Sequence, residues 1–241
     1  MIAPTNNKLI IALDVDSAQK ARELFSSLRE IAGMFKIGMQ LFTAAGPSIV
    51  CDIVDAGSRV FLDLKYHDIP NTVAAAGVEA ARLGVSIFNV HAAGGREMMR
   101  RTADAVTAVS EREGLARPKV IGVTLLTSAD AQVLQEIGVT NSPQQQVIAL
   151  AQLSAESGLD GVVASPLEVS AIRVAVAREG FLIVTPGVRP AGSTAHDQKR
   201  LMTPAAAICA GSDYLVVGRP IIDAPDPVLA AREILLEISG S

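Results

Sequence analysis

Residues 61–73 read Phe-Leu-Asp-Leu-Lys-Tyr-His-Asp-Ile-Pro-Asn-Thr-Val, and the first five residues combine a β-strand pattern with two opposite charges. Because side chains alternate along a strand, Asp63 and Lys65 are predicted to share one face, opposite the two leucines. Charged side chains are seldom placed inside a sheet or barrel unless they are paired. Together with Asp68, which follows the expected end of the strand, this pair indicates chemistry on a substrate whose charge changes during the reaction.

Short β-rich runs recur on both sides of this stretch and alternate with Ala-rich segments of helical periodicity. The predicted strands are residues 8–15, 34–38, 59–65, 86–91, 119–126, 160–164, 181–185 and 213–217. The predicted helices are residues 17–32, 70–84, 94–113, 143–157, 166–179 and 198–211. This alternation predicts an α/β fold, a (β/α)8 TIM barrel that forms a single domain over residues 1–241. A doubly wound open sheet is the alternative, and the long connection at 127–142 is expected to be a loop over the site.

The composition limits the class of protein. The chain has 241 residues, of which 49% are hydrophobic and only 3% aromatic, as suits aliphatic parallel strands covered by helices. A net charge of −4 argues against a nucleic-acid-binding protein, which would carry a basic surface. No apolar run reaches the roughly 18 residues that span a membrane, and the first residues lack the pattern of a signal peptide. Cys51 and Cys209 are expected to be buried free thiols, which fits a cytoplasmic protein.

Polar residues collect at the predicted carboxyl ends of the strands, where barrel enzymes carry their active sites. Beyond Asp63 and Lys65, these residues are Asp14, Lys36, His91, Thr127, Gly218 and Arg219. In isolation, Asp63 and Lys65 are as compatible with a structural ion pair as with catalysis, and the neighbouring charges favour catalysis. His91 is expected to be a hydrogen-bonded packing residue. The cysteines and histidines lack the spacing of zinc ligands, so no metal site is predicted.

The segment Asp63-x-Lys65-x-x-Asp68-Ile69-Pro70-Asn71-Thr72 resembles the signature of the orotidine 5′-phosphate decarboxylase family. Further segments resemble that family in the same order and cover nearly the whole chain. They are residues 12–14 (Ala-Leu-Asp), 35–38 (Phe-Lys-Ile-Gly), 126–128 (Leu-Thr-Ser), 186–189 (Pro-Gly-Val-Arg), 197–200 (Asp-Gln-Lys-Arg) and 217–221 (Val-Gly-Arg-Pro-Ile).

The resemblance implies loss of CO2 from C6 of orotidine 5′-phosphate to give UMP, without a metal or other cofactor. Lys65 would oppose the negative charge that develops on C6 and then donate a proton there. Asp63 would keep Lys65 charged and lie close to the departing carboxylate. Lys36 would bridge the carboxylates and the ribose.

The resemblance also implies which residues bind the substrate. Asp14 would accept a hydrogen bond from a ribose hydroxyl, and Thr127 would hydrogen-bond the pyrimidine edge. The phosphate would lie at the loops after the seventh and eighth strands, where helix N-termini and guanidinium groups suit an anion. The matching phosphate residues are Arg189, Gln198, Gly218 and Arg219.

The position of Asp68 raises a question of reach. It lies three residues beyond Lys65, about 10 Å along an extended chain, so either the chain turns sharply or another subunit supplies this carboxylate. The resemblance implies a homodimer with shared sites, in which each site receives Asp68, Ile69 and Thr72 from the neighbouring chain.

Two other functions compete. Barrel relatives that act on sugar phosphates share the DxKxxD element but use Mg2+ with an acidic residue on the second strand, where this chain has Lys36. A lysine is a poor neighbour for a divalent cation. A non-catalytic nucleotide-binding or scaffold protein could use the same fold. In such a protein the group of charges would have no purpose that offsets its desolvation cost.

Overall fold

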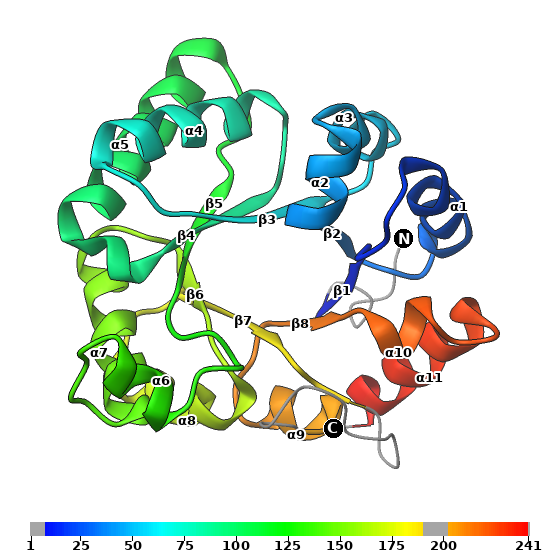
Figure 1. The fold of residues 1–241 in the computed structure, drawn as a ribbon. Helices are drawn as coiled ribbons and strands as arrows, with labels where there is room; N and C mark the ends of the chain where they lie inside the picture. Colours follow the sequence, from blue (N-terminus) through cyan, green and yellow to red (C-terminus); the bar gives the residue numbers. More distant parts are fainter. Residues whose placement is uncertain (1–7, 190–201, 241) are drawn as a thin grey trace.

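The computed structural model describes residues 8–189 and 202–240, and its strands close into a parallel barrel in the order β1 to β8 (Figure 1). The strands are β1 Leu9–Ala12, β2 Met34–Gly38, β3 Val60–Tyr66, β4 Ile87–His91, β5 Lys119–Val123, β6 Gly161–Val163, β7 Leu182–Pro186 and β8 Tyr214–Val217. β1 pairs with both β2 and β8, which closes the ring. The barrel prediction is therefore confirmed, and the open sheet is excluded.

Helices surround the ring of strands on the outside (Figure 1). They are α1 Ala18–Leu28, α2 Met39–Ala45, α3 Ser48–Asp55, α4 Pro70–Arg82, α5 Gly95–Glu113, α6 Ala131–Glu136, α7 Pro143–Glu156, α8 Val169–Ala175, α9 Pro204–Cys209, α10 Arg219–Ile222 and α11 Pro227–Ser239. Two single 3-10 turns, Ala92–Gly94 and Pro166–Glu168, precede α5 and α8. The sequence patterns predicted a last helix that begins at Gly218-Arg219, as α10 does, but they did not predict α2, α3 or α11 as separate helices.

Local capping explains two differences between the predicted and the observed elements. The helix predicted at 198–211 begins only at Pro204, because the Thr203 hydroxyl caps the amide of Ala206; residues 198–201 lie outside the described part. The connection 127–142 is not simply a loop, since Asp130 accepts hydrogen bonds from two backbone amides and starts α6. These caps satisfy the first amides of short helices, which have little periodicity of their own.

The barrel interior has its own apolar cluster, formed by side chains that alternate with those facing the helices. This interior cluster contains Ile10, Ala12, Met34, Phe61, Ile87, Ile121, Val184 and Val216. On three neighbouring strands the next inward position, two residues further along, is polar. These inward polar residues are Lys36 on β2, Asp63 on β3 and Asn89 on β4, and all three are buried. The interior cluster thus forms an apolar floor, and the three inward polar residues form a polar layer above it. A site can therefore form at the carboxyl end of the barrel.

The two cysteines correct one prediction. Both are free, but Cys51 on α3 is only partly buried and Cys209 on α9 is exposed, so the expectation of buried thiols was wrong. Both lie on outer helices, where only one face of a helix meets the barrel. No helix in the described ranges is long and apolar enough to cross a membrane.

Candidate active site

The backbone is irregular where β3 passes the site. β3 and β4 pair at Phe61↔Ile87 and Leu62↔Phe88, but the next pair is Tyr66↔Val90, so a bulge lies between. Lys65 lies in this bulge with a φ of 52°, the one positive φ outside glycine in the described chain. A lysine in the left-handed region is held there by its surroundings, and such residues cluster at functional sites.

Four charged side chains form an alternating chain across the mouth of the barrel. Lys65 Nζ lies 2.6 Å from Asp63 Oδ1, and Lys36 Nζ lies 3.4 Å from Asp63 Oδ2. Lys36 Nζ also donates to Asp14 Oδ1 at 2.8 Å. The side chains of Lys36 and Asp63 are 9% and 12% exposed, whereas that of Asp14 is 49% exposed. Buried charges of this kind persist only when opposite charges compensate them, as they do here.

Sequence reasoning missed one member of this group. Asn89 is fully buried on β4, its Nδ2 donates to Asp63 Oδ1 at 2.7 Å, and its Oδ1 accepts from the Lys65 amide at 2.8 Å. The available signal was an amide side chain inside the apolar strand 86–91, at the alternate position that faces the barrel interior. Asn89 therefore hydrogen-bonds both the Asp63 carboxylate and the backbone amide of Lys65.

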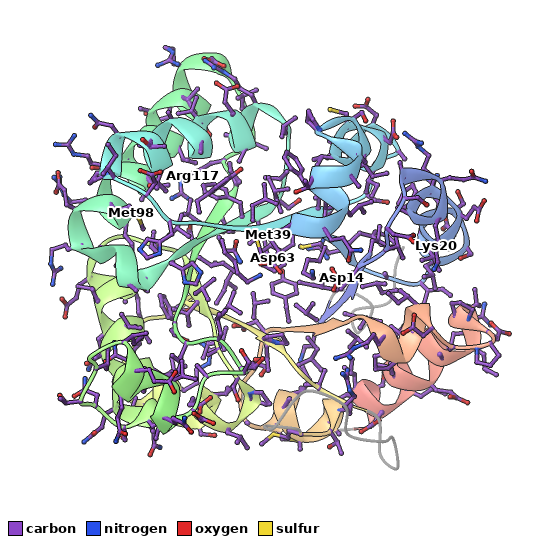
Figure 2. All side chains as sticks on the ribbon, in the orientation of Figure 1. Asp14, Lys20, Met39, Asp63, Met98 and Arg117 are labelled. Carbon is purple, nitrogen blue, oxygen red and sulfur yellow. The ribbon has the colours of Figure 1, made fainter. Side chains whose placement is uncertain are left out.

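Two adjoining cavities open above the apolar floor and share Lys36, Asp63 and Lys65 in their walls. The first, of about 170 Å³, is mainly apolar and extends over β5 and β6 to Thr127. The second, of about 450 Å³, extends between Asp14 and the ends of β7 and β8. Its wall includes Gly38, Gly187, Arg189, Gly218 and Arg219. In Figure 2 the labelled Asp63 and Asp14 lie toward the middle of the ribbon, whereas Lys20 lies at its outer edge on α1.

Gly38 leaves room for the Lys36–Asp14 ion pair in the wall of the second cavity. A Cβ atom at this position would lie 3.0 Å from Lys36 Nζ and 3.1 Å from Asp14 Oδ1, so a side chain here would disturb that ion pair. The absence of a side chain at position 38 thus lets Lys36 and Asp14 pair directly beside the backbone.

Comparison with known proteins agrees with this geometry. Residues 7–234 match the family described as orotidine 5′-phosphate decarboxylase / HUMPS. The chain belongs to this family. It is 54% identical to the orotidine 5′-phosphate decarboxylase of Geotalea daltonii over 231 residues, which is 96% of this chain and 95% of the relative. It is 52% identical to that of Syntrophotalea carbinolica over 241 residues, covering 100% of this chain and 98% of the relative.

Solved structures of this family share the barrel. The crystal structure of orotidine 5′-phosphate decarboxylase from Lactobacillus acidophilus is 38% identical with a TM-score of 0.84, covering 95% of this chain and 98% of that one. The enzyme from Pyrococcus horikoshii is 27% identical with a TM-score of 0.74, covering 97% and 100%.

Three residues that the family resemblance assigns to the site are not brought to it within one chain. Asp68, Ile69 and Thr72 are exposed at the start of α4, and none of them lines either cavity. Asp68 Oδ1 instead accepts a hydrogen bond from the Ile69 amide at 2.6 Å. Gln198, the remaining phosphate residue in the family pattern, lies outside the described residues.

His91 lies beside the group but faces a different neighbour. Its ring centroid is 5.3 Å from that of His67, which is exposed. Burial, followed by repulsion from His67 and Lys65, lowers the pKa of His91 below its ordinary value. A neutral imidazole near Lys65 is compatible with a packing role in this decarboxylase family.

Proposed function

We propose that this chain decarboxylates orotidine 5′-phosphate to UMP in pyrimidine biosynthesis, with Lys65 acting at C6. Membership of the family and the names of relatives at 52–54% identity support the reaction. The observation that carries the mechanism is the Lys65 ammonium, 2.6 Å from the Asp63 carboxylate in the wall of a cavity with an apolar floor. In such a cavity a fixed charge acts more strongly than it does in water.

The reaction removes one negative charge from beside Asp63. The bond between C6 and the substrate carboxylate breaks, neutral CO2 leaves, and the electron pair remains on C6. Lys65 opposes this developing charge and then donates a proton to C6, after which it regains a proton from water. The ammonium group supplies both charge and proton, so the proposal requires no metal and no organic cofactor.

The remaining residues would orient the substrate. Asp14 and Lys36 would bind the ribose, and Thr127 the pyrimidine edge. The phosphate would lie at the far wall of the second cavity, near Arg189, Gly218 and Arg219. Guanidinium groups suit a phosphate dianion because they can donate two parallel hydrogen bonds. Gln198 joins this set on the family resemblance.

A homodimer with shared sites is part of the proposal. Ile69 is 67% exposed at the start of α4, beside Asp68 and three positions before Thr72. Met39, in the wall of the second cavity, is 55% exposed. Large apolar side chains that are exposed in this way indicate a surface that another molecule covers. A second copy would bury them and would bring its Asp68 toward Lys65. We place the enzyme in the cytoplasm, where it would act on its soluble substrate.

An absorbance assay tests the reaction. Purified protein, treated with EDTA, is mixed with orotidine 5′-phosphate, and the loss of substrate absorbance is followed. Turnover without added metal is expected. Failure to turn over, combined with Mg2+-dependent activity on a sugar phosphate, would transfer the chain to the metal-dependent relatives.

A subunit-mixing experiment tests the dimer. Lys65→Ala and Asp68→Ala chains are each expected to be inactive, and they are mixed under conditions that allow subunit exchange. A heterodimer would have one site with both residues intact, so activity should reappear. If mass spectrometry confirms exchange and the mixture stays inactive, Asp68 acts within its own chain or not at all.

A further inference from the structure

We propose that Asn89 is a positioning residue, which holds the Lys65 backbone in its left-handed conformation and fixes the Asp63 carboxylate against the Lys65 ammonium. This inference rests on the role proposed for Lys65. Asn89 lines neither cavity, so it acts through its two neighbours rather than on the substrate.

The bulge in β3 creates the need for this side chain. Backbone pairing with β4 stops after Leu62 and resumes at Tyr66, which leaves the amide of Lys65 outside the regular ladder. A buried backbone donor without an acceptor is costly, so such groups are nearly always paired. Asn89 Oδ1 accepts from this amide at 2.8 Å and so replaces the missing ladder bond.

The other end of Asn89 acts on the carboxylate. Asp63 Oδ1 receives Asn89 Nδ2 at 2.7 Å and Lys65 Nζ at 2.6 Å, so two donors meet at one oxygen. The orientation of the amide follows from its partners, because the Lys65 amide can only donate and an ionised carboxylate can only accept. One rigid side chain thereby links the backbone of Lys65 to the acid that pairs with its ammonium.

The chemistry at this position calls for one acceptor and one donor. Leucine has the same branching at Cγ but supplies neither group. An ionised aspartate supplies the acceptor but sets a second negative charge against Asp63. A protonated aspartate reproduces the asparagine pattern, since its carbonyl oxygen accepts and its hydroxyl donates. The charged groups around position 89 are Asp63 and Lys65 on β3 and Lys36 on β2, with His91 as the titratable neighbour on β4 itself.

The first test compares Asn89→Leu with the parent enzyme. We expect kcat to fall on the order of a hundredfold, as when a reacting group is misplaced by about 1 Å, with KM changed far less. Thr102→Val is the matched control, because Thr102 is equally buried and bonded to the Met98 carbonyl in α5, away from the site. It should lower stability and leave kcat unchanged. Equal kcat losses in the two variants, or an unchanged kcat in Asn89→Leu, would overturn the proposal.

The second test uses pH. In Asn89→Asp, kcat relative to the parent should be lowest when the introduced carboxyl is ionised and should rise as the pH falls and this group takes up a proton. Dividing the kcat of the variant by that of the parent at each pH cancels the effects of groups that titrate in both proteins, such as His91 and the substrate. A purely structural role would not produce such recovery, so a flat or falling ratio in the folded variant would refute the inference. This variant also covers the case in which Asn89→Leu does not fold.

Discussion

The two ends of the barrel each hold an aspartate between two cations, but they hold it differently. At the carboxyl end, Asp63 is bound by the side chains of Lys36, Lys65 and Asn89 and faces two cavities. At the amino end, Asp160 accepts from Arg117 at 2.8 Å, from Lys119 at 3.2 Å, and from the backbone amide of Val120 at 2.9 Å. The amino-end carboxylate ties two strands together, whereas the carboxyl-end carboxylate remains next to space that a substrate can enter.

The amino-end arrangement recurs on alternate strands. Asp160 immediately precedes β6 and accepts from an amide of β5, and Asp213 immediately precedes β8 and accepts from the amide of Ile183 in β7 at 2.6 Å. Arg173 pairs with Asp213 as Arg117 pairs with Asp160. Repetition at the amino face of a barrel indicates a role in closing the sheet. The carboxyl-end network occurs where the pairing of β3 with β4 is irregular. Its role therefore differs from that of the amino-end carboxylates, which hold the strands of the sheet together.

The sharpest way to test this contrast is to remove one lysine from each end. Lys65→Ala should leave a folded protein with kcat lowered by at least about a thousandfold, because both the opposing charge and the proton donor are lost. Lys119→Ala, the matched change at the amino end, should leave kcat near that of the parent. Steady-state kinetics with circular dichroism checks both variants. More than about a tenth of parental activity in Lys65→Ala would remove the assigned role.

A smaller effect is expected at the phosphate end of the cavity. Arg219→Ala should lower kcat/KM for orotidine 5′-phosphate by a factor equivalent to about 2–5 kcal/mol, the cost of removing one partner of a charge-assisted pair. The loss should be much smaller on orotidine without its phosphate, which gives Arg219 nothing to bind. Measuring kcat/KM of the parent and of Arg219→Ala on both substrates gives a thermodynamic cycle, which isolates the interaction between Arg219 and the phosphate. Equal fractional losses would mean that Arg219 supports the fold or the ring site instead.

The smallest effect on activity is expected at the amino end. Asp160→Asn should cost about 1–3 kcal/mol of unfolding free energy, because the buried Val120 amide and the partly buried Arg117 guanidinium lose a charged acceptor, while kcat stays unchanged. Urea unfolding of both proteins measures the difference. A parallel loss of kcat would show that the two ends are not separate.

The same pair of proteins gives a pH test. Burial raises the pKa of Asp160, but the Val120 amide and the Arg117 side chain outweigh burial and hold that pKa below its ordinary value. The folded protein therefore binds fewer protons here than the unfolded chain, so the stabilisation is complete above the unfolded pKa of about 4 and is lost as the pH falls through the folded pKa. The stability difference between parent and Asp160→Asn should narrow in acid. A difference that grows there would contradict the assignment.

The sequence predicted the barrel because eight apolar runs alternate with helical segments. This pattern arises from which side chains are buried in each strand and helix, so it can be read from the order of apolar and polar residues. It also placed Asp63 and Lys65 on one face, since they are two residues apart on a strand. It did not reveal the positive φ of Lys65 or the partnership of Asn89, because both depend on a bulge between strands that only the three-dimensional pairing defines. The short helix α6 was missed because its start is set by the Asp130 cap rather than by periodicity.

The stacking of a polar layer directly on the apolar floor, two residues along β2, β3 and β4, constrains how this protein can change. Core and site use the same two-residue period, so deleting one residue within β3 would turn Asp63 toward the helices and a leucine toward the substrate. Deletions inside these strands should therefore abolish folding and activity together, while the helix-to-strand connections at the amino end of the barrel can lengthen or shorten. Descendants of this chain can diversify the loops at the amino end of the barrel, but the strands that carry Lys36, Asp63 and Asn89 must keep their length.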